Sequence, residues 1–149
     1  MSARLRMAMA RTARTLVATA VVLPATVFTA TAQDWDCTNA GDLPQQGMNW
    51  CAAMDYQSAD RALNVLWPKV RQHMKDMDAD LADLGPDLVG AEDALLKAQR
   101  AWIEYRDGHC ASEGFAARGG SLEPLLVSSC KAHMTKERTQ ELLLLMETY

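Results

Sequence analysis

The sequence predicts an all-α fold of about three helices in an up-down arrangement, stapled by two disulfides. Apolar residues recur at three- and four-residue steps over three long segments, and no segment shows the strict alternation of a half-buried strand. Stretches that contain glycine or proline separate these segments. The chain has 149 residues, too few for two ordinary domains, and its four cysteines supply the two covalent links.

Residues 1–32 have the composition of a secretory signal peptide. An uncharged run at residues 16–30 follows four arginines, which are Arg4, Arg6, Arg11 and Arg14. The run ends in the small-residue sequence Ala30-Thr31-Ala32. A membrane-anchoring helix is the alternative, but the run is short and Pro24 interrupts it. We expect cleavage before Gln33, a mature domain of residues 33–149, and a periplasmic or secreted location without a membrane anchor.

Cleavage would leave a strongly acidic protein. The chain has 15 Lys and Arg against 19 Asp and Glu, and residues 1–32 hold four arginines and no acid, so the net charge would change from −4 to −8. Nucleic acid and anionic membranes are therefore not expected as partners, and a macromolecular partner should be cationic. The alternative is that the acidic surface only keeps the domain in solution.

The first helix is expected after an irregular lead-in at residues 33–47, which contains Gly41, Pro44 and Gly47 without a sustained period. The apolar stripe of this helix consists of Tyr56, Ala59, Leu63, Leu66, Val70, Met74 and Met77. Pro68 lies inside the stripe and predicts a kink, or a break and restart. Residues 76–87 contain five aspartates and predict an acidic connector, whose last acids would complement the dipole of the next helix.

The second helix is expected from about Leu88 to near Ala117, with residues 118–121 ending it. A third helix should begin after Ser121, a suitable N-cap, and tolerate Pro124 in its first turn. Its apolar stripe consists of Leu122, Leu126, Cys130, Met134, Leu142 and Met146. The second and third helices therefore form an antiparallel hairpin.

The cysteines are expected to form disulfides because they all follow the signal peptide of a chain bound for an oxidising compartment. Cys110 and Cys130 lie ten residues on either side of Gly120, so a hairpin that turns there brings them level and leaves Cys37 with Cys51. Four cysteines allow three pairings, and the hairpin favours this one. Their spacings match no zinc or haem motif, so neither a metal nor a cofactor is predicted, and His109 is interpreted as a packing residue.

Several polar residues interrupt or border the apolar stripes: Asp60, Asn64, Gln99, Tyr105, Arg106 and Arg138. An unpaired charge in an apolar interface is costly, so we expect Asp60 to meet one or both arginines, with the uncharged members adding hydrogen bonds. The alternative is a catalytic carboxylate with an arginine clamp. The three histidines are scattered and no nucleophile motif accompanies them, which favours a structural network and no enzymatic activity.

Ordered short motifs extend from about residue 37 to residue 145. They are Asn49-Trp50-Cys51-Ala52; Tyr56 with Ala59-Asp60 and Leu63-Asn64; Ala98-Gln99-Arg100-Ala101-Trp102-Ile103 with Tyr105-Arg106-Asp107 and Cys110; Gly119-Gly120-Ser121; and Cys130 with Thr135, Arg138 and Leu142. Together they resemble the family of small secreted domains named after the N-terminal part of the LprI lysozyme inhibitor. Trp67-Pro68 departs from the unbroken helical stretch that this family is expected to have.

The resemblance implies a helical, disulfide-linked envelope protein that binds and inhibits a lysozyme, here a cationic one. A structural or adaptor module of the bacterial envelope is the alternative. For an inhibitor, we expect Arg118, beside Gly119 and Gly120 at the tip of the hairpin, to enter the target's cleft and pair with its two catalytic carboxyl groups. The alternative is that the glycines only end a helix and Arg118 complements its C-terminal dipole.

Overall fold

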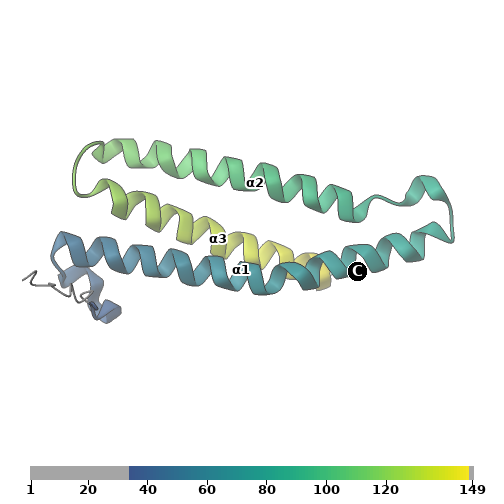
Figure 1. Cartoon of the computed structure of the whole chain (residues 1–149), viewed down its shortest axis with the longest axis horizontal. Coiled ribbons are helices and arrows are strands. Elements are labelled where there is room, and N and C mark those ends of the chain that lie inside the picture. Colours follow the sequence, from purple (N-terminus) through teal and green to yellow (C-terminus); the bar gives the residue numbers. More distant parts are fainter. Residues whose placement is uncertain (1–33, 148–149) are drawn as a thin grey trace, which may run out of the picture. The chain divides into compact units, whose positions relative to one another are not determined.

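Three long helices make up most of residues 34–147, the part of the chain that this computed structural model describes (Figure 1). They are α1 (Gln45–Ala82), α2 (Ala91–Gly114) and α3 (Glu123–Glu147), and the described residues include no strand. Three short 3₁₀ helices accompany them, which are η1 (Cys37–Asp42), η2 (Pro86–Leu88) and η3 (Phe115–Ala117). Because α1, α2 and α3 follow one another in alternating directions, the predicted all-α up-down fold is confirmed.

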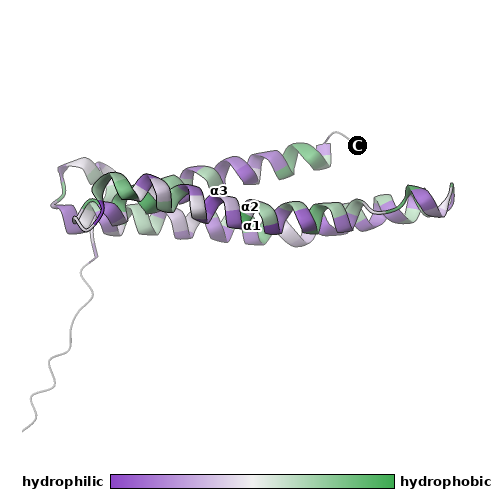
Figure 2. Ribbon diagram, turned by 90° about the horizontal axis from the view of Figure 1, so that it is seen from above, coloured by the Kyte–Doolittle hydropathy of each residue, from purple (hydrophilic) through white to green (hydrophobic). Residues whose placement is uncertain are grey.

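The core lies where the three helices meet, since each long helix packs against the other two. Its buried apolar residues are Leu63, Leu66, Val70, Met74, Leu95 and Leu142, of which the first four belong to the stripe predicted for the first helix. Trp67 and Trp102 pack against this cluster. Figure 2 shows apolar and polar residues alternating along each helix, as expected for helices that bury one face.

The N-terminal segment is more ordered than the irregular lead-in predicted for residues 33–47. The Asp36 carboxylate accepts hydrogen bonds from the backbone N–H and the hydroxyl of Thr38, and this cap starts η1. α1 then begins at Gln45, and the carbonyl of the preceding residue, Pro44, accepts a hydrogen bond from the Met48 N–H at 3.1 Å. Gly47 lies inside α1, where a Cβ would approach the Trp35 ring to 3.0 Å. The glycine therefore marks close packing here, not a loop.

α1 continues through Pro68 without a break, so the expected break and restart is wrong. Proline removes one backbone hydrogen bond and leaves the carbonyl four residues earlier without its N–H partner. Pro68 and Asn64 both lie on the exposed side of the helix, where water can satisfy that carbonyl. The departure at Trp67-Pro68 therefore leaves the helix continuous.

The acidic segment 76–87 was expected to be a connector, but α1 extends through its first half to Ala82. The Asp78 carboxylate reaches across to the start of α2 and accepts hydrogen bonds from the backbone N–H groups of Gly90, Ala91 and Glu92, at 2.7, 2.7 and 3.0 Å. These three bonds lower the pKa of Asp78. An acid does complement the dipole of α2, but it comes from the preceding helix and not from the end of a loop.

The hairpin helices are shorter than predicted. α2 begins at Ala91, because Leu88 belongs to η2, and it ends at Gly114 before η3. Ser121 does not cap α3; it lies in the turn, and the first helical carbonyl is that of Leu122, which accepts from the Leu126 N–H at 3.2 Å. The predicted N-cap was therefore one residue too early, and Pro124 does lie in the first turn of α3.

Two disulfides link the fold, and both predicted pairings are confirmed. Cys37–Cys51 ties η1 to α1 with a Cα–Cα distance of 5.6 Å, and Cys110–Cys130 ties α2 to α3 with a Cα–Cα distance of 5.5 Å. Within residues 34–147, none of the helices combines the length and the apolar character needed to cross a membrane.

Candidate functional site

The turn between α2 and α3, residues 118–122, lies at the end of a tightly closed hairpin. The Cys110–Cys130 disulfide joins the two helices a short distance behind the turn. Gly114 lies closer to the turn, and a Cβ at this position would come within 2.5 Å of the Val127 side chain. The two helices are therefore in close contact just before the chain reverses, which restricts the conformations of the turn.

The Arg118 side chain is 64% exposed, but it has two partners in the elements that flank the turn, Phe115 of η3 and Glu123 of α3. Its Nη1 atom donates to Glu123 Oε1 at 2.6 Å, and its guanidinium stacks over the Phe115 ring at 4.6 Å. Glu123 also accepts from the Gly119 N–H at 2.8 Å. This backbone bond first, and then the bond from Arg118, lower the pKa of Glu123.

The backbone of the turn requires glycine at position 119. Gly119 has φ +77°, in the left-handed region that residues with a Cβ rarely adopt. The adjoining Gly120 donates its N–H to the Ala117 carbonyl at 2.9 Å. The two glycines therefore reverse the chain tightly, with Arg118 directly before the reversal.

α1 contacts the turn through a hydrogen bond from Asn49. The Asn49 amide donates to the Ser121 carbonyl at 2.9 Å, and the Gln45 amide in turn donates to Asn49 at 2.7 Å. Asn49 thus links the first turns of α1 to a loop 72 residues later in the sequence. This contact gives a structural role to the Asn49-Trp50-Cys51-Ala52 motif.

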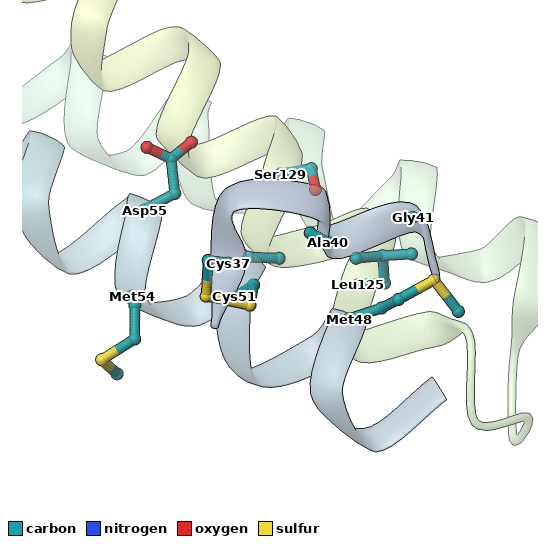
Figure 3. A pocket seen from close by; sticks show the side chains of 10 residues that line it. Cys37, Ala40, Gly41, Met48, Cys51, Met54, Asp55, Leu125 and Ser129 are labelled. Carbon is teal, nitrogen blue, oxygen red and sulfur yellow. A yellow bond between two sulfur atoms is a disulfide. The ribbon is translucent and has the colours of Figure 1, made fainter. Parts of the chain in front are cut away.

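An apolar groove of about 610 Å³ lies at the same end of the molecule, between η1, α1 and α3 (Figure 3). Its walls are lined by Cys37, Ala40, Gly41, Met48, Cys51, Ala52, Met54, Asp55, Leu125 and Ser129. Figure 3 shows the Cys37–Cys51 disulfide between the Met54 and Met48 side chains, with Leu125 beside Met48. The Asp55 carboxylate is already paired with Lys136 Nζ, at 2.7 and 2.8 Å. Flexible methionine side chains allow such a groove to adapt to an apolar partner.

The polar residues of the helix interface centre on Arg106, which is only 6% exposed. Its guanidinium bonds Asp107 at 2.9 Å, donates to the Thr135 hydroxyl at 3.3 Å, and lies 3.9 Å from Asp60. Asp60 accepts a hydrogen bond from the Asn64 amide at 2.9 Å, and its side chain is 41% exposed. The structure thus brings Asp60, Asn64 and Arg106 together, with Asp60 at the solvent edge.

Arg138 belongs to a second polar group, which also lies near Trp102. It donates to the Gln99 amide oxygen at 3.1 Å and to Glu141 at 2.8 Å. Both arginines contact the Trp102 ring, with Arg106 Cζ at 5.0 Å and Arg138 Cζ at 5.9 Å from its centre. Tyr105 belongs to neither group: its side chain is 62% exposed and its ring stacks on His109.

Asp107 is the closest carboxylate to Arg106. Burial alone would raise the pKa of Asp107, but hydrogen bonds and charges from Arg106 and Lys131 outweigh burial and lower it. Lys131 approaches from α3 at 3.1 Å, so Asp107 bridges cations on two helices. Of these two pairings, the one with Lys131 joins α3 to α2, whereas Arg106 and Asp107 are neighbours on α2.

The sequence predicted the hairpin turn and most of the polar residues of the helix interface, but it did not predict which residues these would bind. Arg118, Gly119 and Gly120 do lie together at the tip of the hairpin, whereas Glu123 as a partner of Arg118 was not foreseen. An acid five residues after the arginine, at the start of a helix, was the available signal. The groove depends on η1 folding back over α1, and no local pattern in residues 33–47 indicates that.

Comparison with known proteins gives a consistent result. A family model described as "Lysozyme inhibitor LprI" matches residues 37–142. An uncharacterized protein of Rhizobium meliloti (strain 1021) is 50% identical over 113 residues, which cover 76% of this chain and 80% of that protein. The crystal structure of a DUF1311 family protein from Pseudomonas putida KT2440 is similar with a TM-score of 0.59 and 27% identity, covering 74% of this chain and all of the other.

Proposed function

The chain belongs to the LprI lysozyme inhibitor family, and on this premise we propose that it binds and inhibits a cationic lysozyme outside the cytoplasm. The observation that carries the proposal is the family match over residues 37–142, which includes both disulfides and the hairpin turn. The family is named for inhibition and not for catalysis. The protein's partner in this proposal is therefore an enzyme, whereas the protein itself is a binding module.

A periplasmic or secreted location is part of the proposal. Two disulfides in one small domain suit an oxidising compartment, and residues 1–32 have the composition of a signal peptide. The signal peptide lies outside the described residues, so its support comes from sequence. Intact-mass measurement of the exported protein tests the assignment: a mature chain beginning at Gln33 is expected, and a species that retains Arg4 to Arg14 would contradict it.

Charge favours a cationic target. Residues 33–149 contain 11 Lys and Arg against 19 Asp and Glu. An acidic surface attracts a basic enzyme during diffusional encounter and increases the association rate. The same surface repels other acidic proteins, so it contributes selectivity as well as rate.

Arg118 is the side chain that we propose to enter the target's active site. Lysozyme, the type case of this chemistry, cleaves its substrate with two carboxyl groups, one acting as the acid and the other as the nucleophile or stabiliser. In the free protein Arg118 already binds a carboxylate, that of Glu123, in an exposed setting. Exchanging Glu123 for a carboxylate of the target replaces one ion pair by another, so little electrostatic energy is lost. Glu123 keeps its bond from the Gly119 N–H after the exchange.

The surroundings of Arg118 reduce the ordering cost of binding. The Cys110–Cys130 disulfide and the Asn49 bond to Ser121 hold the turn in place before the target arrives. The methionine-lined groove beside the turn offers an adaptable apolar surface for the rim of the target's cleft. Arginine is one of the residues enriched among interface hot spots.

The test compares inhibition of a purified cationic lysozyme by the wild type, Arg118→Glu and Arg100→Glu. Arg100 is an exposed arginine of α2, so the second variant makes the same charge change away from the turn. Arg118→Glu should weaken inhibition by about tenfold or more, because an introduced carboxylate repels those of the target, while Arg100→Glu should stay within about threefold of the wild type. Circular dichroism of all three proteins checks that they fold equally.

Two outcomes would contradict the proposal at different levels. If Arg118→Glu inhibits as well as the wild type, the turn is not the inhibitory element, although inhibition stands. If the wild type inhibits no cationic lysozyme, the family's named activity does not extend to this chain, and an adaptor module of the envelope becomes the better interpretation.

A further inference from the structure

The apolar stripe of α1 continues beyond the part of the helix that the core covers. Val70 is 0% exposed and Met74 is 5% exposed, and both belong to the core. Further along the chain, Met77 and Leu81 are only partly buried, and Leu84, just after the helix, is 76% exposed. Steps of three and four residues separate these five side chains, so the stripe extends to the end of α1.

α3 ends before it reaches this part of α1. Figures 1 and 2 show α1 and α2 continuing past the end of α3. η2, which lies between α1 and α2, packs on α1, and no contact links it to α3 within residues 34–147. Leu88 of η2 and the following Val89 are 54% and 44% exposed. Residues 76–93, which we call the distal tip, therefore present apolar side chains that no third helix of the described chain covers.

The distal tip is also strongly acidic, with seven Asp and Glu residues and no Lys or Arg. Two of these acids have partners within the protein, since Asp78 caps α2 and Glu92 pairs with Arg71. Four others are exposed and form no side-chain hydrogen bond or ion pair within residues 34–147: Asp80, Asp83, Asp87 and Asp93. The carboxylates of the distal tip do not converge into a group that could hold a metal ion. Their charge is therefore available to a larger cationic partner.

A hollow of about 360 Å³ lies beside the stripe at the start of the distal tip. Its lining residues are His73, Asp76, Met77, Asp80 and Leu81, whose spacing places them on one face of α1. Apolar side chains and carboxylates thus alternate along the hollow. The Nε2 atom of His73 is buried without a hydrogen-bond partner, which costs free energy that a donor from a partner would recover.

We propose that the distal tip is a docking surface for a basic amphipathic helix of another protein. The apolar side chains of that helix cover the end of the stripe, in the manner of a helix bound in a groove. Its lysines and arginines flank this contact, because their aliphatic stems can pack on Met77 and Leu81 while their charged ends reach Asp76 and Asp80. The contact takes the place beside α1 and α2 that α3 leaves uncovered.

This inference does not rest on lysozyme inhibition, because the distal tip and the turn at residues 118–122 lie at opposite ends of α2. That helix has 24 residues and is therefore about 36 Å long. The two surfaces also differ in charge, since the turn offers Arg118 and the distal tip offers only acids. Loss of one binding activity should leave the other intact.

Charge and hydrophobicity together decide the class of partner. A second copy that docked through the same surface would bring seven more acids against it, and an anionic membrane would be repelled in the same way. Acidity alone would only keep the domain in solution, but exposed Leu84, Leu88 and Val89 act against solubility. A contiguous exposed apolar patch with a polar rim is typical of an interaction site.

The experiment measures binding of a labelled synthetic helical peptide of about four turns by fluorescence anisotropy, at an ionic strength of about 0.15 M. The peptide carries leucines at three- and four-residue steps on one face and arginines on both flanks. The control peptide has glutamate in place of every arginine. One arginine peptide should bind per protein, at least about 100-fold more tightly than the glutamate peptide. Equal affinity for the two peptides, or no binding of the arginine peptide, would overturn the proposal.

Variants of the exposed apolar residues test where the peptide binds. The Leu84→Ser/Leu88→Ser protein should bind the arginine peptide about tenfold or more weakly, because it loses apolar surface that the peptide covers. Val65→Ser is the matched control, since Val65 is 68% exposed on α1 but lies outside the distal tip. All these side chains are exposed, and circular dichroism checks that the variants fold equally. Unchanged affinity of the double variant would overturn the proposal.

A second pair of variants separates local from overall charge. Asp80→Asn should weaken binding of the arginine peptide by about threefold or more, whereas Glu104→Gln, at an exposed acid of α2 outside the distal tip, should change it by less than about twofold. Equal losses would show that the peptide responds only to net charge, which would contradict a defined surface. Arg118→Glu should leave peptide binding within about twofold of the wild type, because the turn is remote.

Sedimentation velocity tests the other occupant of the distal tip. Without peptide the protein should sediment as a monomer, because the acidic surfaces of two copies repel each other. A dimer that the Leu84→Ser/Leu88→Ser change abolishes would identify a second copy as the occupant and would overturn the proposal.

Discussion

Arg106 is a buried cation in the helix interface, and several neighbours offset the cost of removing it from water. Two aromatic rings face its guanidinium, Tyr56 at 5.4 Å and Trp102 at 5.0 Å. Asp107 supplies the close charge, and the fully buried Thr135 hydroxyl accepts a hydrogen bond from Nη1. Asp60, at 3.9 Å, adds a weaker and more exposed charge. Most of the compensation for Arg106 therefore comes from partners other than Asp60.

Arg106→Ala should destabilise the protein by about 3 kcal/mol, because it leaves a cavity in the interface and removes the partner of the buried Thr135 hydroxyl. Asp60→Ala should cost no more than about 1 kcal/mol, since exposed ion pairs contribute little. Denaturant unfolding monitored by circular dichroism measures both. Equal losses for the two variants would show that Asp60 is the principal partner of the arginine.

The positions of Arg106 and Arg138 in the helix interface were predictable, but their pairings were not. Arg106 and Arg138 interrupt apolar stripes, and periodicity alone places such residues against the core. Asp107 is not predicted as the partner of Arg106, because adjacent residues on a helix do not normally face each other. In the structure it pairs both with Arg106 and with Lys131, which comes from α3. Cross-helix contacts of this kind depend on helix register, which the order of residues does not reveal.

At the scale of elements, the start of α2 depends on a residue of α1. Asp78 accepts hydrogen bonds from three backbone N–H groups that have no partner inside α2, and it lies twelve residues before the first of them. Sequence predicted an acidic connector here because five aspartates in twelve residues resemble a solvated loop. The stretch instead continues α1 to Ala82, since favourable packing of one face outweighs low helix propensity.

Asp78→Asn should lower the thermal midpoint at neutral pH, because it removes the charge that the three N–H groups stabilise. The pKa of Asp78 is lower in the folded protein than its ordinary value of 3.8. Its stabilising effect is therefore complete above that value and is lost as the pH falls through the folded-state pKa. Thermal unfolding from pH 7 to pH 2 should show the two proteins converging at low pH. Asp80→Asn is the control, and a gap that persists at pH 2 would contradict the assignment.

Two glycines of α2 have opposite roles that sequence alone cannot distinguish. A Cβ at Gly114 would come within 2.5 Å of Val127, whereas a Cβ at Gly108 would have no neighbour within 4 Å. The first glycine allows α2 and α3 to approach closely behind the turn. The second is a helix interior position without a packing role.

Gly114→Ala should therefore destabilise the protein by about 1–3 kcal/mol through overpacking. Gly108→Ala should stabilise it by about 0.5–1 kcal/mol, because alanine restricts the unfolded chain and favours the helix. Chemical denaturation under the same conditions measures the change in the free energy of unfolding for both variants. A stabilising Gly114→Ala would mean that the helices separate at no cost and that the turn is less restrained than we describe.

At the scale of the whole molecule, the fold and the charge serve different parts of the proposed function. The helices and disulfides place Arg118 and the apolar groove at one end, and both are short-range features that act once the partners touch. The acidic residues are spread along the chain, with five of them in residues 76–87 near the opposite ends of α1 and α2. They act at longer range, before contact, and so should influence the association rate more than the dissociation rate.

Salt should therefore separate the two contributions in binding kinetics with a cationic lysozyme. Raising the ionic strength from about 0.02 M to about 0.5 M should lower the association rate by about tenfold or more, since the screening length falls from about 20 Å to less than 5 Å. The dissociation rate should change little. A triple variant, Asp80→Asn with Asp83→Asn and Asp87→Asn, should bind more slowly at low salt but dissociate like the wild type, whereas Arg118→Glu should dissociate faster. An association rate that does not depend on salt would show that the acidic surface has no steering role, and only the contacts at the turn and the groove would remain to explain affinity.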